Sequence, residues 1–145
     1  TGADVLTGGA GADTFVFGIT GSVSGTDTDE ITDFTLASDI LSFAAVTVLV
    51  ADASALVATS NVNTSTGGKI SFAAADDTLS EMITAILADS ELDVAGSTGF
   101  FELGADTYVY NAGTAIGGAD DQIIKLTGVL GLDTITDLGT TLTIA

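Results

Sequence analysis

The N-terminal residues follow a nine-residue period, and this period constrains the fold of the chain more than any other feature. Residues 8–16 read G-G-A-G-A-D-T-F-V, and residues 2–7 repeat part of the same frame, so that Asp4 and Asp13 are equivalent positions. Glycines allow turns in which backbone carbonyls converge on one point, and the aspartate adds negative charge there. The residues after each aspartate predict a short strand, with Phe15 packed inward. Repetition of such units predicts a parallel β-roll that holds Ca²⁺ between its turns.

Three alternative interpretations of these glycine-rich and acidic residues do not involve a calcium-binding repeat. Ordinary glycine-rich turns are the simplest of them, because they need no metal. A dinucleotide-binding loop does not fit, because Gly9 and Gly11 are not followed by a third glycine in place or by a helix signal. An EF-hand does not fit either, since the acidic segment 27–29 is not followed by the glycine and the glutamate that such a loop requires.

The charge balance excludes several classes of function. The chain has 145 residues, with 20 Asp and Glu against 2 cationic residues, Lys69 and Lys125, which gives a formal net charge of −18. Without a basic patch, neither nucleic acid nor an anionic membrane surface is expected as a main partner. Histidine and cysteine are absent, which excludes the usual zinc sites, disulfides and Ser-His or Cys-His catalysis. We therefore expect a non-enzymatic chain whose acids keep it soluble or bind divalent cations.

The residues after position 43 predict a β-rich module with one main helix. Thr78 and Glu81 form a capping-box pattern, and an apolar stripe that includes Met82 then predicts a helix to about Glu91. A hairpin is expected around the three-residue loop 104–106. Strands are expected at residues 39–43, 46–50, 69–72, 99–103, 107–111, 122–127 and 140–145.

The glycine-rich repeat resembles that of the RTX (repeat-in-toxin) family, whose members bind calcium and are exported by type I secretion. Segment 33–43, which begins with an Asp-Phe pair, is similar to the segment that caps the β-roll in this family. Ala37 and Ser38 stand where the family usually has glycine. Residues 104–110, 120–128 and 140–145 are similar to the C-terminal module of large RTX adhesins and surface-layer proteins, which carries an uncleaved export signal.

The resemblance also implies a set of calcium ligands. In family rolls successive turns alternate sides, which would bring Asp13 near the acidic segment 26–30. Asp4 and Asp13 would bind through their side chains and the glycines through their backbone. The implied ligands are Asp4, Asp13, Gly2, Gly9, Gly11, Asp27, Asp29 and Asp39.

The expected organisation has two parts. Residues 1–43 would form the end and cap of the β-roll, and residues 44–145 the C-terminal module with the type I secretion signal. No signal peptide is visible at the first residues, and the longest nearly apolar run, 40–51, has about 12 residues and is too short to cross a bilayer. Because the chain starts without Met and within a repeat, we interpret it as a fragment of a longer protein.

Three functions are compatible with these features. The first is a calcium-binding folding and secretion module of a surface-layer protein or adhesin, secreted or displayed on the bacterial cell surface. Its partners would be calcium, the type I secretion machinery during export, and cell-surface polysaccharide or neighbouring copies in a surface layer. The second is the C-terminal part of a secreted hydrolase, a metalloprotease or lipase, whose catalytic residues lie upstream in a HExxH or GxSxG motif. The third is a carbohydrate- or surface-binding module.

Overall fold

A computed structural model describes residues 2–18, 27–44, 47–48, 62–65, 67–89, 92, 94–114, 120–137 and 141–144. Within these ranges the protein is mainly β with one helix, which confirms the expected mainly-β class. The elements are β1 (Val5–Leu6), β2 (Thr14–Val16), β3 (Asp29–Ile31), β4 (Ile40–Ser42), β5 (Thr47–Val48), β6 (Val62–Thr64), β7 (Ile70–Phe72), α1 (Leu79–Ala88), β8 (Ser97–Leu103), β9 (Asp106–Asn111), β10 (Gln122–Leu126), β11 (Ile135–Asp137) and β12 (Thr141–Ile144).

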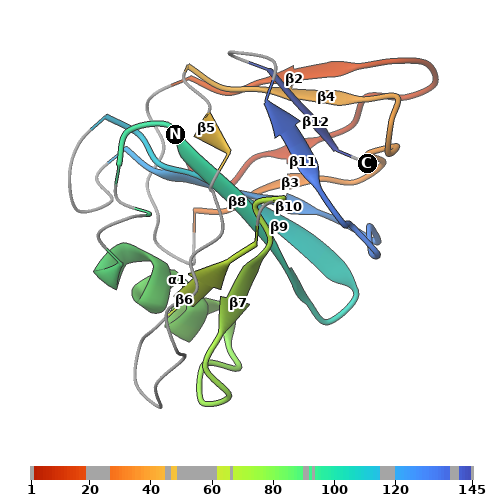
Figure 1. The fold of residues 1–145 in the computed structure, drawn as a ribbon. Helices are drawn as coiled ribbons and strands as arrows, with labels where there is room; N and C mark the ends of the chain where they lie inside the picture. The colour runs from red at the N-terminus through yellow and green to blue at the C-terminus, as the bar shows by residue number, and fades with distance from the viewer. Residues whose placement is uncertain are drawn as a thin grey trace.

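The described strands form two larger sheets and a small ribbon (Figure 1). The six-stranded sheet has the order β1-β3-β10-β9-β8-β5, and the four-stranded sheet has the order β11-β12-β4-β2. Strands β6 and β7 pair with each other in the ribbon. The first and last parts of the chain therefore contribute to both larger sheets.

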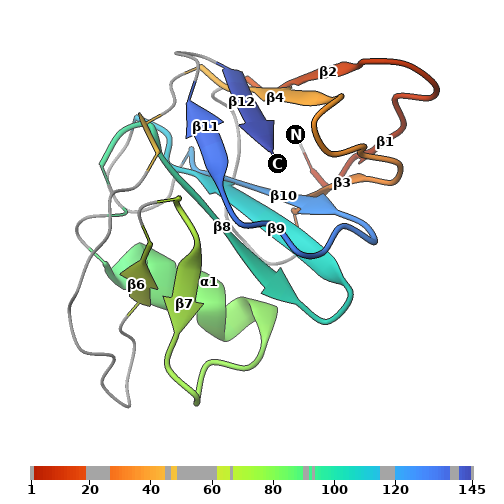
Figure 2. The ribbon, with the colours of Figure 1, turned by 45° about the vertical axis from the view of Figure 1, so that its right-hand side comes forward.

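The first four strands alternate between the two larger sheets. The parallel pair β1 and β3 lies in the six-stranded sheet, and the parallel pair β2 and β4 lies in the four-stranded sheet. We call β1 to β4, with the described residues that join them, the N-terminal coil. The loop between β1 and β2 lies beside the loop between β3 and β4 (Figure 2). Phe15, at the middle of β2, is buried as the period predicts.

The C-terminal strands complete both sheets that the coil begins. Strand β10 pairs with β3 in parallel, and β12 pairs with β4 in antiparallel orientation. Leu41 from the coil and Leu126 from β10 are fully buried in the same apolar cluster. Aromatic residues of the coil, Phe15 and Phe17 among them, belong to this cluster too. The coil therefore buries its apolar face against the C-terminal strands.

The helix begins as predicted and ends earlier. The Thr78 hydroxyl accepts a hydrogen bond from the backbone N–H of Glu81, and the Glu81 carboxylate accepts one from the Thr78 backbone, which confirms the capping box. Met82 is buried in a second apolar cluster between α1, the β6–β7 ribbon and the β8–β9 hairpin. The helix ends at Ala88, because the extended Asp89 caps it and acidic residues disfavour a helix C-terminus. The predicted end at Glu91 lies outside the described residues.

The central hairpin has a tighter turn than predicted. Leu103 pairs with Asp106, so two residues form the turn rather than three. Gly104 has φ of +68°, which suits the first central position of a type II′ turn. Among the described residues, no helix has the length and apolar character that crossing a membrane requires.

Candidate metal centre

The parallel register places four of the candidate aspartates in two pairs. Val5 pairs with Glu30, so Asp4 stands beside Asp29 at the start of β1 and β3. Thr14 pairs with Ile40, so Asp13 stands beside Asp39 at the start of β2 and β4. Each pair has the same contact: Asp4 N–H donates to Asp29 Oδ1 at 2.9 Å, and Asp13 N–H donates to Asp39 Oδ1 at 3.0 Å. The nine-residue period therefore places an aspartate at the start of both edge strands.

The glycine-rich turn, residues 7–13, packs against residues 32–39. Asp33 accepts hydrogen bonds from the backbone N–H groups of Gly8 at 2.9 Å and Gly9 at 2.8 Å. These two bonds hold the pKa of the Asp33 carboxyl below its usual value. The Ser38 hydroxyl donates to the Gly11 carbonyl at 3.1 Å. Side chains of the later loop thus satisfy backbone groups of the earlier one.

This stacking corrects the expected partner of Asp13. The family pattern predicts segment 26–30 beside Asp13, but its residue Asp29 lies beside Asp4 instead. The partner of Asp13 is Asp39, which is 3% exposed and also accepts the Thr35 N–H at 2.8 Å. The prediction assumes that every unit has nine residues, whereas the loop between β2 and β3 is longer. Asp27 lies two residues before β3 and is exposed.

Asp13 is the most distinctive residue of the turn. Its Oδ2 atom is buried and accepts no hydrogen bond from the described residues. A Cβ atom at Gly8 would lie 2.7 Å from this oxygen, so only glycine leaves room for the carboxylate at that place. A buried carboxylate oxygen without a donor is costly unless a cation or another partner neutralises it. The turn therefore presents an acceptor that its own backbone does not satisfy.

The backbone of the turn also depends on glycine. Gly9 and Gly11 have φ of +95° and +127°, and Gly2, at the position equivalent to Gly11, has φ of +98°. These values lie in the left-handed region, which other residues rarely adopt. In the later loop Ala37 has φ of +61°. Ala37 thus holds a conformation that glycine would adopt without strain, at the place where the RTX resemblance expects glycine.

The donor set fits a hard cation better than a soft one. Calcium binds six to eight oxygen ligands, which include carboxylates and backbone carbonyls. Asp13 supplies a carboxylate oxygen that no described residue satisfies, and the backbone carbonyls of the glycine turn that precedes it are the candidates for further ligands. No group of three or more acidic side chains is gathered for a metal within the described ranges. A bound calcium ion would supply counter-charge to Asp13, and backbone carbonyls would have to complete its coordination.

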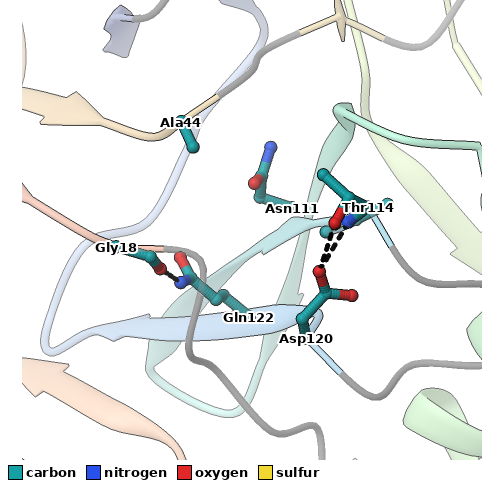
Figure 3. Close-up of a pocket in the computed structure, with 8 residues that line it drawn as sticks. Gly18, Ala44, Asn111, Thr114, Asp120 and Gln122 are labelled. Carbon is teal, nitrogen blue, oxygen red and sulfur yellow. Dashed lines mark hydrogen bonds between the residues drawn. The ribbon is translucent and has the colours of Figure 1, made fainter.

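A small pocket lies where the coil meets β9 and β10 (Figure 3). Gly18, after β2, and Ala44, after β4, line it on one side, and Asn111 and Gln122 line it from β9 and β10. Gln122 donates its side-chain amide to the Gly18 carbonyl. The volume of about 20 Å³ accommodates a water molecule and no larger ligand. This pocket is therefore not a candidate site for an organic ligand.

An open groove of about 390 Å³ lies between β7, β8 and the start of α1. Phe72, which packs against the buried Phe101, contributes aromatic surface to it, and Asp76 and Asp77 lie on its acidic side. The Oδ2 atom of Asp76 is buried and accepts no hydrogen bond from the described part of the chain. The groove combines apolar surface with carboxylate acceptors, as sites for polar organic ligands do.

No protein-family model matches the chain, and no curated protein is significantly similar to it.

Sequence reasoning did not select Asp33, which contacts the glycine turn more directly than Asp27 does. The sequence did contain a signal for Asp33, because Asp33 and Phe34 form the Asp-Phe pair that begins segment 33–43, and the glycine turn packs against this segment. The other missed group is the ion pair between Glu30 and Lys125, at 3.2 Å. Their register cannot be read from the sequence, because 95 residues separate them.

Proposed function

We propose that this chain is a calcium-binding C-terminal folding and secretion module of a type I-secreted surface-layer protein or adhesin. The observation that carries the proposal is the buried carboxylate oxygen of Asp13, in a glycine turn, to which no residue in the described ranges donates a hydrogen bond. The alternation of β1 to β4 between two sheets supports a β-roll architecture for the N-terminal coil. The RTX resemblance of the repeat supports the link to type I secretion.

The charge of the chain suggests how calcium would act. A net charge of −18 opposes compaction, and the two lysines offset little of it. In the calcium-poor cytoplasm the coil would remain loose enough for export. Outside the cell, calcium would supply counter-charge to Asp13 and order the coil against the C-terminal strands. The coil residues themselves would position the carboxylate, since Asp33 fixes the turn and Gly8 leaves room for it.

A calcium titration followed by hydrogen exchange tests the binding part. Calcium should increase the protection of the Asp13 amide, and magnesium at the same concentration should do so weakly, because it demands a small octahedral site. Equal protection in calcium and in chelator would contradict calcium binding. For export, a passenger fused to residues 1–145 should be secreted by a type I-competent strain, and a fusion without residues 100–145 should not. Undiminished secretion of the shorter fusion would contradict a C-terminal signal.

The open groove favours a second candidate function, binding of cell-surface carbohydrate. Sugars bind where aromatic surface adjoins carboxylate acceptors, and Phe72 and Asp76 provide both in the groove. Glycan-array binding that is lost in Phe72→Ala and Asp76→Asn would support this function. Absence of binding to bacterial surface glycans, with the fold intact, would exclude it.

A further inference from the structure

One cation joins the N-terminal coil to the C-terminal strands. Lys125 of β10 stands opposite Glu30 of β3 in the parallel register. Its Nζ atom lies 3.2 Å from Glu30 Oε1 and 3.3 Å from Asp106 Oδ2 on β9. Thr127 donates its hydroxyl to the same Glu30 oxygen. We call the contact between β3 and β10, with these four side chains, the seam.

The seam depends on a charge that the chain can hardly replace. The only other cationic residue is Lys69, which pairs with Glu102 at 3.5 Å on β8. Without Lys125, the carboxylates of Glu30 on β3 and Asp106 on β9 would face each other across β10 with no cation between them. Their side chains are 31% and 22% exposed, so water screens their repulsion only in part. Removal of the lysine charge therefore replaces two attractions with one repulsion.

The pKa shifts of Glu30 and Lys125 both favour the charged form of the pair. The hydroxyl of Thr127 and the ammonium of Lys125 hold the pKa of Glu30 below its usual value, and Glu30 raises the pKa of Lys125. Asp106 acts in the opposite direction on the pKa of Glu30, and β9 also contributes the phenol of Tyr108, whose pKa burial raises. A lowered carboxyl pKa stabilises the folded state at pH values above the ordinary carboxyl pKa. A raised lysine pKa stabilises it at pH values below the ordinary lysine pKa.

The seam is directly connected to the Asp4–Asp29 pair, one of the two pairs of candidate aspartates. Glu30 follows Asp29, whose carboxylate accepts the Asp4 N–H. The Glu30 N–H donates to the Asp4 carbonyl at 2.8 Å. The backbone of Glu30 thus holds β1 on one side, while its side chain holds β10 on the other. Any displacement of β3 from β10 changes the position of the Asp4–Asp29 pair.

We propose that Lys125 is a positioning residue whose charge closes the seam and thereby holds the Asp4–Asp29 pair in register. Loss of this charge weakens the pairing of β3 with β10 and loosens β1, although Lys125 does not touch Asp4 or Asp29. The effect on calcium affinity rests on the proposed function, whereas the effect on the seam does not.

Hydrogen exchange on the full chain tests the seam in chelator, where calcium plays no part. Lys125→Gln removes the charge, Lys125→Arg retains it, and Lys69→Gln is the matched control on the other lysine. Two amides report directly: Thr127 N–H donates to the Ile31 carbonyl across the seam, and Glu30 N–H donates to Asp4. Lys125→Gln should reduce the protection of both by about tenfold. The Ala112 amide, which donates to Ser97 in the central hairpin, should change much less.

The remaining variants decide between a charge effect and a packing effect. Lys125→Arg should keep most of the protection, and the double variant Glu30→Gln/Lys125→Gln should recover most of what Lys125→Gln loses, because the repulsion is gone. If Lys125→Gln does not fold, a folded double variant supports the proposal and an unfolded one overturns it. Unchanged protection in Lys125→Gln, or an equal loss in Lys69→Gln or Lys125→Arg, also overturns it.

A calcium titration of the same variants separates this proposal from the proposed function. The half-saturating calcium concentration should rise about three- to tenfold in Lys125→Gln and remain unchanged in Lys69→Gln. A wild-type protein with no calcium response, together with a seam that opens in chelator, would contradict the proposed function alone. Equal half-saturation in the wild type and Lys125→Gln would contradict the coupling alone.

Discussion

Replacement of Asp13 by asparagine should have opposite effects with and without calcium. In chelator, the wild-type turn contains a buried carboxylate oxygen that no described residue satisfies. The Asp39 carboxylate stands beside it at the start of the neighbouring strand. Asparagine removes the buried charge and the repulsion between the two acids. We therefore expect Asp13→Asn to melt at the same temperature as the wild type in chelator, or slightly above it.

With calcium the order should reverse. At 100 times its dissociation constant, one bound ion stabilises the folded state by about 2.7 kcal/mol. For a domain of this size 1 kcal/mol changes Tm by about 3 °C, so the wild type should gain about 8 °C. Asp13→Asn lacks the charged oxygen and should gain at most a small part of this shift. Asp133→Asn is the matched control, because Asp133 is exposed and the change in net charge is the same.

Calorimetry of the three proteins at pH 7, in calcium and in chelator, measures these shifts. A gain of about 8 °C in the wild type and in Asp133→Asn, but not in Asp13→Asn, is the expected result. The reasoning is refuted if Asp13→Asn gains as much as the wild type. It is also refuted if Asp13→Asn is destabilised equally in both conditions, because Asp13 would then have a purely structural role.

Three further substitutions test the turns. Gly8→Ala should abolish most of the calcium shift in Tm, because its Cβ would lie 2.7 Å from Asp13 Oδ2; an unaltered calcium shift would contradict the packing of the turn. Ala37→Gly should raise stability by about 1 kcal/mol in chemical denaturation, since it relieves a φ of +61°, and a loss of stability would count against this strain. Asp33→Asn should destabilise the protein at pH 7 and flatten the pH dependence of its stability below about pH 4. The lowered pKa of Asp33 stabilises the folded state at pH values above the ordinary carboxyl pKa, and this contribution is lost as the pH falls. An acid limb identical to that of the wild type would contradict this contribution.

Local signals in the sequence predicted most of the elements, although they missed β3, β6 and β11. The nine-residue period correctly predicted a strand directly after Asp13 and the burial of Phe15. Both features depend on interactions within a few residues, namely the glycine turn and the alternation of side chains along the strand. The capping box at Thr78 likewise fixed the start of α1. The end of the helix and the hairpin turn were less well predicted. Each depends on the backbone conformation of a single residue, Asp89 or Gly104, and the local sequence is compatible with more than one conformation there.

The stacking of the coil was the main error in the candidate site. The expectation of equal units put Asp13 beside segment 26–30, whereas a longer connection between β2 and β3 moves the partner to Asp39. The register follows from burial of Ile31 and Leu41 in the shared core, which only the complete fold decides. For the same reason the sequence could not predict that β10 and β12 extend the two sheets of the coil.

The central claim is that the glycine turn before β2 binds calcium through Asp13. A crystal structure of the protein grown in calcium, with the ions located by their anomalous signal, tests it most directly. The account predicts an ion about 2.3–2.6 Å from a carboxylate oxygen of Asp13 and from carbonyls of the glycine turn. Anomalous peaks only at other sites, or a turn with no ion at millimolar calcium, would contradict it.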